Sequence, residues 1–265
     1  MSWNITRVYR AAHKYLFRDT RYFFLYLLRS LSDGHRNGCA FYGNDAFVKL
    51  IESGKSFIRL GDGEIGLLHY LPIHYQKWSP AIRDDFLSII GDYSDSSPYI
   101  LMIPLFVNAT NAELGRISKL QVWMPLKVTY EMIFPKDATY FDQHIFYRDG
   151  MFEKLLLPYL AKKKIIVVTN AKNIADLRAS PFHARVFAYI PSPDADAYEA
   201  REDIRNAIEQ MVRKNGLPKN AFVVLLAAGL AKTIVYTMSK EGYQLFDVGK
   251  GLEGFYKGMS LEHQI

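Results

Sequence analysis

The 265-residue sequence contains a single cysteine, Cys39, and no long hydrophobic run. One cysteine excludes an internal disulfide and a cysteine-rich zinc site, and it suits a reducing compartment. The longest apolar run near the N-terminus covers residues 22–28, whereas a membrane-spanning helix needs about 20 apolar residues. The sequence also starts without a signal-peptide pattern, so we expect a cytoplasmic protein.

Several catalytic signatures are missing as well. The seven histidines show no H-E-x-x-H spacing, and neither a G-x-S-x-G nucleophile motif nor a P-loop occurs. No repeat, low-complexity segment or Pro/Gly/Ser-rich linker divides the chain, and its 49% hydrophobic content suffices for a sizeable core. We therefore expect one domain over residues 1–265, with an N-terminal helical segment at 1–52 and an α/β core at 53–256.

Positive charge gathers at the N-terminus. The net charge is +6, and residues 1–31 carry six basic residues against the single acid Asp19. The basic residues are Arg7, Arg10, Lys14, Arg18, Arg21 and Arg29. The first five share one helical face, which predicts a basic amphipathic helix, most simply packed on the domain with its basic face solvated. The alternative is peripheral contact with an anionic membrane surface or a lipid phosphate.

The charge distribution also bears on nucleic acid as a partner. The remainder of the chain is almost balanced in charge and carries no recognised nucleic-acid motif. We therefore expect no nucleic-acid partner.

Strands and helices alternate after residue 52. The predicted strands are 56–60, 99–105, 139–146, 164–169, 186–190, 221–227 and 244–248. The clearest helices are predicted at 198–215 and 230–241, each followed by a glycine that suits a C-terminal cap. This alternation predicts an α/β fold with a mostly parallel sheet.

The most informative motif, Arg59-Leu-Gly-Asp-Gly-Glu64, follows the first predicted strand. Gly61 and Gly63 let the backbone bend tightly and let a ligand approach Asp62 closely. Asp62 and Glu64 supply two carboxylates, and Mg²⁺ and Mn²⁺ prefer such oxygen ligands together with water and phosphate oxygens. The motif therefore predicts a site for a metal-bound diphosphate.

Two other interpretations fit the same residues. Gly61, Gly63 and Gly66 match the dinucleotide fingerprint G-x-G-x-x-G. We disfavour it, because Asp62 and Glu64 would place negative charge beside a bare pyrophosphate and because residues 79–90 look helical where a second strand should end. The other alternative is an acidic surface turn.

Polar or glycine-rich residues also follow four later strands. They are Thr169-Asn170, residues 191–194, Ala228-Gly229 and Asp247-Val248-Gly249. Because ligands bind outside the carboxyl ends of parallel strands, we expect these segments to share one edge with Asp62.

Three segments resemble bacterial glycosyltransferases of the GT-D fold, formerly a domain of unknown function. Residues 59–64 resemble the family's Arg-Phe-Gly-Asp-Gly-Glu signature, residues 226–232 its Gly-Pro-Thr-Ala-Lys segment, and residues 242–249 its Gly-Tyr-x-x-Ile-Asp-Ile-Gly segment. The resemblance covers residues 45–256, with a looser match at 191–198. Two departures concern ligand contacts: Gly229-Leu230 replaces the family's Pro-Thr, and Lys250 stands where the family often has His.

The resemblance implies a Rossmann-like fold and a hexosyltransferase activity. The donor would be a nucleotide diphosphate sugar, with a UDP-sugar expected. The acceptor would be a glycan, glycoprotein or lipid-linked molecule in cell-surface polysaccharide synthesis. In the family the Asp-x-Glu motif binds the divalent metal that holds the diphosphate. Carried over, Asp62 and Glu64 would bind Mn²⁺ or Mg²⁺.

Other residues are candidates for donor contacts. They are Arg59, Gly61, Gly63, Asn170, Gly229, Lys232 and Gly249. Arg59 and Lys232 would stabilise charge on the diphosphate, although Arg59 equally suits a structural ion pair and Lys232 a solvated surface position. Asn170 also suits a helix cap.

An inverting transfer needs a general base near the acceptor hydroxyl. The candidates at predicted strand ends are Asp142, Asp194, Asp196 and Asp247, and the family segment favours Asp247. A retaining mechanism and the oligomeric state stay open. Two other functions also stay open: a metal-dependent phosphohydrolase or nucleotidyltransferase that uses the same acids, and a non-catalytic module that binds a nucleotide or glycan.

Overall fold

The computed structural model describes residues 19–117, 120–145, 152–229 and 231–257. Eight strands form one sheet in the order β1-β4-β3-β2-β8-β7-β5-β6, with all neighbours parallel. The strands are β1 Ala40–Phe41, β2 Ser56–Arg59, β3 Tyr99–Ile103, β4 Thr139–Asp142, β5 Lys164–Thr169, β6 Val186–Pro191, β7 Phe222–Ala227 and β8 Leu245–Asp247. The predicted α/β fold with a parallel sheet is confirmed.

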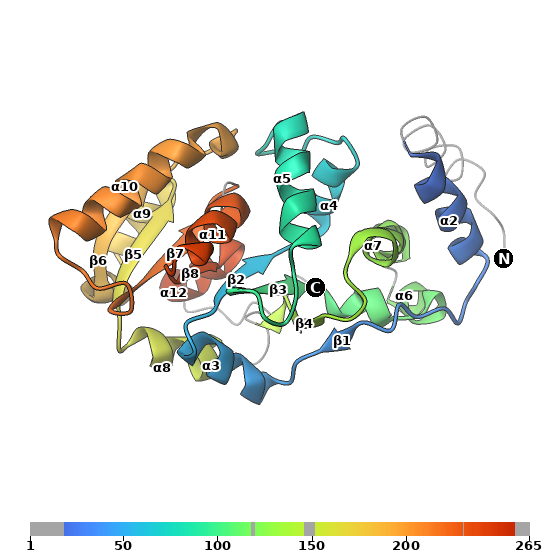
Figure 1. The fold of residues 1–265 in the computed structure, drawn as a ribbon, viewed down its shortest axis with the longest axis horizontal. Coiled ribbons are helices and arrows are strands. Elements are labelled where there is room, and N and C mark those ends of the chain that lie inside the picture. The colour runs from blue at the N-terminus through green and yellow to red at the C-terminus, as the bar shows by residue number, and fades with distance from the viewer. Residues whose placement is uncertain (1–18, 118–119, 146–151, 230, 258–265) are drawn as a thin grey trace.

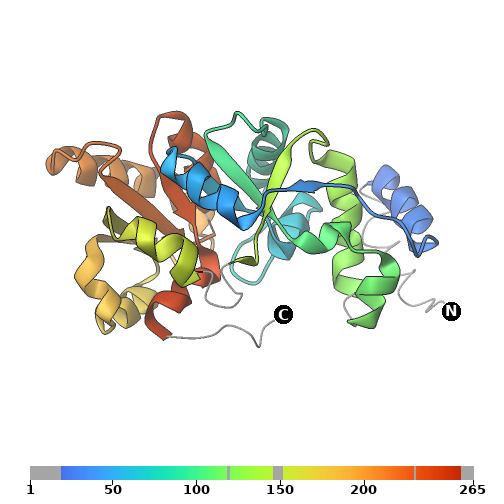
Figure 2. The same ribbon diagram turned by 90° about the horizontal axis from the view of Figure 1, so that it is seen from below.

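Helices cover both faces of the sheet (Figures 1 and 2). One hydrophobic cluster joins the sheet to α4 Asp62–Leu68, α5 Pro80–Gly91, α7 Leu120–Ile133, α10 Arg201–Lys214 and α11 Ala231–Lys240. A second cluster joins the opposite face to α3 Asn44–Glu52, α8 Leu157–Leu160, α9 Ala171–Arg178 and α12 Gly254–Lys257. The helices α2 Thr20–Ser30 and α6 Asn111–Arg116 lie beside α7.

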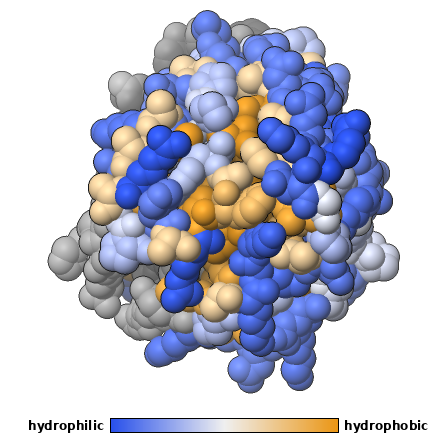
Figure 3. Space-filling model, turned by 90° about the vertical axis from the view of Figure 1, so that its left-hand side faces the viewer, coloured by the Kyte–Doolittle hydropathy of each residue, from blue (hydrophilic) through white to orange (hydrophobic). Residues whose placement is uncertain are grey.

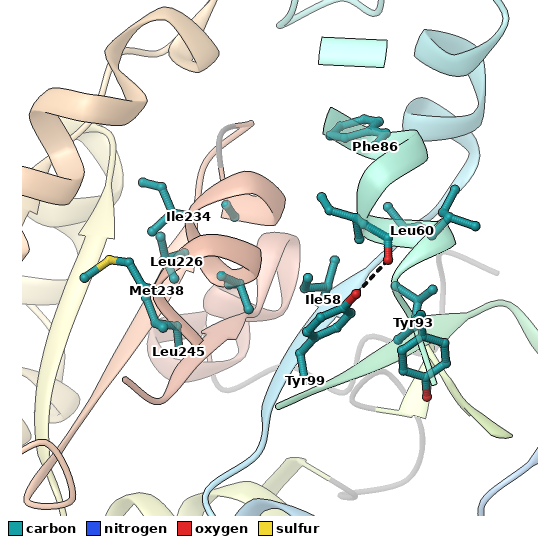
Figure 4. Packing of buried hydrophobic residues seen from close by; sticks show 14 of the residues in the cluster. Ile58, Leu60, Phe86, Tyr93, Tyr99, Leu226, Ile234, Met238 and Leu245 are labelled. Atoms are coloured by element: carbon teal, nitrogen blue, oxygen red, sulfur yellow. Dashed lines mark hydrogen bonds between the residues drawn. The ribbon is translucent and has the colours of Figure 1, made fainter. Parts of the chain in front are cut away.

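Helices on both faces explain the continuous apolar runs of the central strands. In β7, Val223 and Leu225 belong to one hydrophobic cluster, whereas Val224 and Leu226 belong to the other. Successive side chains of a strand point to opposite faces, so a strand covered on both faces needs apolar residues throughout. Figure 4 shows α5 and α11 packing their hydrophobic side chains against this sheet.

Most predicted elements are present with shorter bounds. Gly216 and Gly242 have φ values of +57° and +83°, as expected for glycines that end α10 and α11. The predicted strand at 139–146 ends at Asp142: the Gln143 N–H still donates to the Ile103 carbonyl of β3, and the chain turns at residues 143–144. The sequence analysis missed β1, which lies within the expected N-terminal helical segment.

The two ends of the sheet differ. β1 and β6 are the edge strands, and β6 borders the face shown in Figure 3, where hydrophobic residues lie exposed between hydrophilic rims.

The helix predicted from the basic residues of the N-terminus falls mostly on residues 1–18, outside the described residues. Among the described residues, no helix combines the length and apolar character needed to cross a bilayer.

Candidate active site

The strand ends grouped by the sequence analysis meet at one edge of the sheet. β2, β8 and β7 are neighbours, so Glu64 after β2, Asp247 at the end of β8 and Lys232 after β7 lie close together. Lys232 Nζ lies 3.0 Å from Glu64 Oε1 and 3.3 Å from Asp247 Oδ2. One cation is thus placed between two carboxylates, one from α4 and one from β8.

This three-residue cluster is buried, and the pKa shifts of Glu64 and Lys232 favour their charged forms. Glu64 and Lys232 are each 8% exposed, and Asp247 is 1% exposed. Burial by itself lowers the pKa of Lys232, but Asp247 and Glu64 outweigh it and raise that pKa above its ordinary value. Burial by itself raises the pKa of Glu64, but Lys232 and the Gly61 N–H hold that pKa below its ordinary value. Lys232 is therefore not a solvated surface lysine.

Glu64 also fixes the start of α4. Its Oε2 accepts a hydrogen bond from the Gly61 N–H at 2.8 Å, which is one half of a capping box, since Gly61 has no side chain to supply the other half. A carboxylate can accept about four hydrogen bonds, so Glu64 keeps free acceptor positions after its contacts with the Gly61 N–H and the Lys232 ammonium. Asp62 differs, because it is the first residue of α4 and its side chain is exposed.

The carboxylates of Asp62 and Glu64 do not form a complete metal site by themselves. Within the described residues, no group of three or more His, Cys, Asp or Glu side chains could hold a metal ion by itself. Mg²⁺ in phosphate-transfer sites takes one or two carboxylates and completes its shell with water and phosphate oxygens. Asp62 offers an exposed carboxylate for such a site, and Glu64 offers a buried one that Lys232 already contacts.

Arg59 links β2 to the end of β8. Its backbone N–H donates to Asp247 Oδ2 at 3.1 Å, and its Nη1 donates to the Val248 carbonyl at 2.7 Å. Gly249 follows with φ +48°, and a Cβ at this position would lie 2.8 Å from Arg59 Nη1. The guanidinium therefore occupies space that only a glycine leaves free.

Tyr75 and Gln76, which the sequence analysis did not select, close the site from the loop between α4 and α5. A Cβ on Gly63 would lie 3.4 Å from Tyr75 Oη, and a Cβ on Gly229 would lie 3.4 Å from Gln76 Oε1. Burial and the negative charge of Glu64 raise the pKa of Tyr75 to about 12, so its hydroxyl stays protonated. Neither residue belongs to a local motif.

Gln143 is the third residue that the sequence analysis missed. It follows β4, and its Oε1 lies 3.3 Å from where a Cβ on Gly61 would be. The sequence analysis placed Gln143 inside the predicted strand 139–146, so no strand-end signal marked it. An adjacent cavity of about 130 Å³ is lined by Phe41, Phe141 and Asp142, among others.

The remaining candidates have structural partners. Asn170 caps α9, because its Oδ1 accepts from the Asn173 N–H at 2.8 Å. Asp196 accepts from the Lys77 N–H at 2.7 Å and pairs with the Lys77 ammonium. Asp194 is exposed, and Asp142 accepts from the Leu105 N–H at 3.3 Å. Of the four candidate bases, Asp247 is the one in the buried cluster.

Known proteins share this architecture. The family model described as "Glycosyltransferase GT-D fold" matches residues 57–257. A "Probable glycosyl transferase Gly" from Streptococcus gordonii is 26% identical over 220 residues, which are 76% of this chain. This chain spans only 30% of the length of that relative.

Solved structures agree at the level of the fold. A structure described as a new glycosyltransferase (DUF1792) from Streptococcus sanguinis is similar with a TM-score of 0.67 and 22% identity, and it covers 86% of this chain and 87% of its own. Another, described as a domain of unknown function 1792 with a distinct glycosyltransferase fold, has a TM-score of 0.66 and 18% identity and covers 86% of both chains.

Proposed function

This chain belongs to the glycosyltransferase GT-D fold family, and we propose that it is a metal-dependent hexosyltransferase. Its donor would be a nucleotide diphosphate sugar, with a UDP-sugar expected, and its acceptor a glycan, glycoprotein or lipid-linked molecule in cell-surface polysaccharide synthesis. The observation that carries the proposal is the buried Glu64–Lys232–Asp247 cluster beside the exposed Asp62.

Lys232 is suited to stabilise the leaving diphosphate. Negative charge builds on the diphosphate as the bond to the sugar breaks, and a fixed cation in a dry site stabilises that charge without reorganisation. Lys232 is the second residue of α11, so the free amides of the first turn add to the favourable potential for an anion. Asp247 and Glu64 hold the ammonium in place, so we assign Asp247 a positioning role through Lys232.

Asp62 and Glu64 would hold Mn²⁺ or Mg²⁺. When bound, the ion acts as a Lewis acid on the diphosphate oxygens. Gly61, Gly63 and Gly229 carry no Cβ, which lets the side chains of Gln143, Tyr75 and Gln76 lie close to the backbone at this edge. Arg59 and Gly249 support the site at the end of β8, where the Arg59 guanidinium donates to the Val248 carbonyl.

We propose that the reaction takes place in the cytoplasm, which suits the free thiol of Cys39.

Thermal unfolding with nucleotide diphosphates tests this function. We expect UDP with Mn²⁺ to raise the unfolding temperature by about 5–10 °C at a hundredfold excess over Kd, and UDP with chelator to raise it less. Incubation with UDP-sugars and saccharide acceptors should then yield a glycoside detected by mass spectrometry. Undiminished turnover in excess chelator would disprove the metal dependence.

Two outcomes would support other functions. Release of phosphate or nucleoside monophosphate without any glycoside would indicate a phosphohydrolase or nucleotidyltransferase that uses the same acids. Nucleotide or glycan binding without metal enhancement and without turnover would indicate a non-catalytic module.

A further inference from the structure

Helix α2 exposes an apolar ridge. Phe24, Leu28 and Leu31 are 63%, 58% and 69% exposed, and they are the most exposed large hydrophobic side chains among the described residues. Their spacing of four and three residues places them on one face of the helix. We call Phe24, Leu28 and Leu31 the α2 ridge.

The α2 ridge faces outward because the opposite side of the helix is anchored. Tyr22 is fully buried against Met124 and Val128 of α7, and its hydroxyl donates to the Pro125 carbonyl at 3.0 Å. Arg29 Nε donates to Glu131 Oε2 at 2.9 Å. These contacts fix the rotation of α2, so the ridge does not turn into the core.

Positive charge accompanies the ridge. Arg21 is exposed on the same face, one turn before Phe24. Residues 1–18 of the sequence contain four basic residues and no acidic residue, and Asp19 then caps α2. The neighbouring helix α6 ends in the exposed Arg116, followed by Ile117, which is 49% exposed. Asp33, after α2, is the exposed acid at this end.

We propose that the α2 ridge docks the protein on an anionic lipid bilayer. A helix that combines large apolar side chains with basic residues lies in the interfacial plane, with its apolar face about 5–10 Å into the boundary between headgroups and acyl chains. Each basic side chain near an anionic surface adds to the attraction. α2 lies at one end of the molecule in Figures 1 and 2, so a flat surface can reach it.

A second copy of the chain suits the ridge less well. A stable protein–protein interface buries about 800 Å² on each partner. Three side chains on one face of an 11-residue helix supply only part of that area. The same three side chains are enough for interfacial insertion, where the basic residues supply the remaining attraction.

The docked surface is physically connected to the candidate active site. The Tyr22 ring lies 4.2 Å from His69, which ends the helix α4 that begins with Asp62. The proposed docking does not depend on the proposed function.

Vesicle co-sedimentation of the full chain tests the proposal. We expect binding to phosphatidylcholine vesicles that contain phosphatidylglycerol, and little binding to pure phosphatidylcholine. The double substitution Phe24→Ser/Leu28→Ser should weaken binding at least about tenfold, because it removes the apolar area that enters the lipid. Phe187→Ser, which changes a 38% exposed side chain on the edge strand β6, should bind like the wild type.

Two charge-reversal variants test the contribution of the basic residues. Arg21→Glu should weaken binding to the anionic vesicles, and Lys214→Glu, an equal charge change at the end of α10, should not. Thermal unfolding checks that every variant is folded. The proposal would be overturned if the Phe24→Ser/Leu28→Ser variant bound the anionic vesicles as tightly as the wild type does, or if the wild type did not bind them. So would a wild-type dimer that the ridge variant converts to a monomer in light scattering.

Discussion

Asp62 combines an exposed carboxylate with no contact that the fold requires. Asp62→Asn removes the charge and keeps the side-chain volume, so it should lower kcat by about 100-fold or more if the residue binds the metal. The change should cost no more than about 1 kcal/mol of stability, the usual value of a first-turn acid. Asp45→Asn, an exposed first-turn acid of α3, is the matched control. An unchanged rate of sugar transfer in the Asp62→Asn variant would show that Asp62 is not a metal ligand.

Lys232 is the cation shared by the buried carboxylates of Glu64 and Asp247. Lys232→Met keeps the aliphatic length but leaves Glu64 and Asp247 without their shared cation, which should destabilise the protein by about 3–5 kcal/mol. Lys240→Met on the same helix breaks an exposed pair with Asp92 and should cost about 1 kcal/mol at most. Urea unfolding at neutral pH compares the two variants. Equal losses would mean that the buried cluster contributes no more than a surface pair.

The cluster should also make stability depend on pH. Because the pKa of Glu64 is lowered in the folded protein, its stabilisation is complete above the ordinary pKa of about 4.3 and is lost as pH falls through the lower folded value. In the Lys232→Met variant, burial would raise the pKa of Glu64. Protonation of Glu64 at lower pH would then remove the buried negative charge and restore part of the lost stability. The stability difference between wild type and Lys232→Met should therefore shrink from pH 7 to about pH 4. A difference that is constant over this range would contradict the charge assignment.

At the scale of elements, the junction after β8 decides where Arg59 lies. Gly249→Ala would force a side chain into a left-handed backbone and within 2.8 Å of Arg59 Nη1. We expect a loss of about 1–3 kcal/mol in unfolding free energy, together with weaker UDP binding. Gly251→Ala is the control, since a Cβ there meets nothing within 4 Å. Chemical denaturation and calorimetry with UDP measure both effects, and matching values for the two variants would show that the junction tolerates a side chain.

Elements also show how far local patterns reach. The buried runs of β5 and β7 and the glycines after α10 and α11 are local signals, and their predicted elements are present. β1 has two residues, too few for a periodic pattern, and it exists because the Tyr42 N–H donates to the Tyr140 carbonyl. Residues 197–200 form a 3-10 turn, so α10 starts later than predicted. Such limits depend on hydrogen bonds between distant segments.

At the scale of the whole molecule, the interior of the sheet carries the stability. Leu225 is fully buried in β7, and Leu225→Ala should cost about 2–5 kcal/mol because it leaves a cavity under closely packed neighbours. Leu31→Ala, the same substitution at a 69% exposed site, should cost about 0.5 kcal/mol or less. Urea unfolding should show a lower midpoint with an unchanged slope for Leu225→Ala. Similar midpoints for both variants would contradict the assigned core.

The sequence by itself determined the parallel α/β fold and the presence of two acids, Asp62 and Glu64, directly after the first long strand. Both depend on patterns within a few residues: apolar runs of strand length, helix caps, and two acids between glycines. Only the tertiary structure decided which groups surround these two acids. Lys232 and Gln143 lie far from Glu64 along the chain, and the strand order β4-β3-β2-β8-β7 brings the segments that carry them to one edge. Burial there makes Lys232 and Glu64 a fixed ion pair, because a charge removed from water is strongly destabilising unless an opposite charge lies beside it.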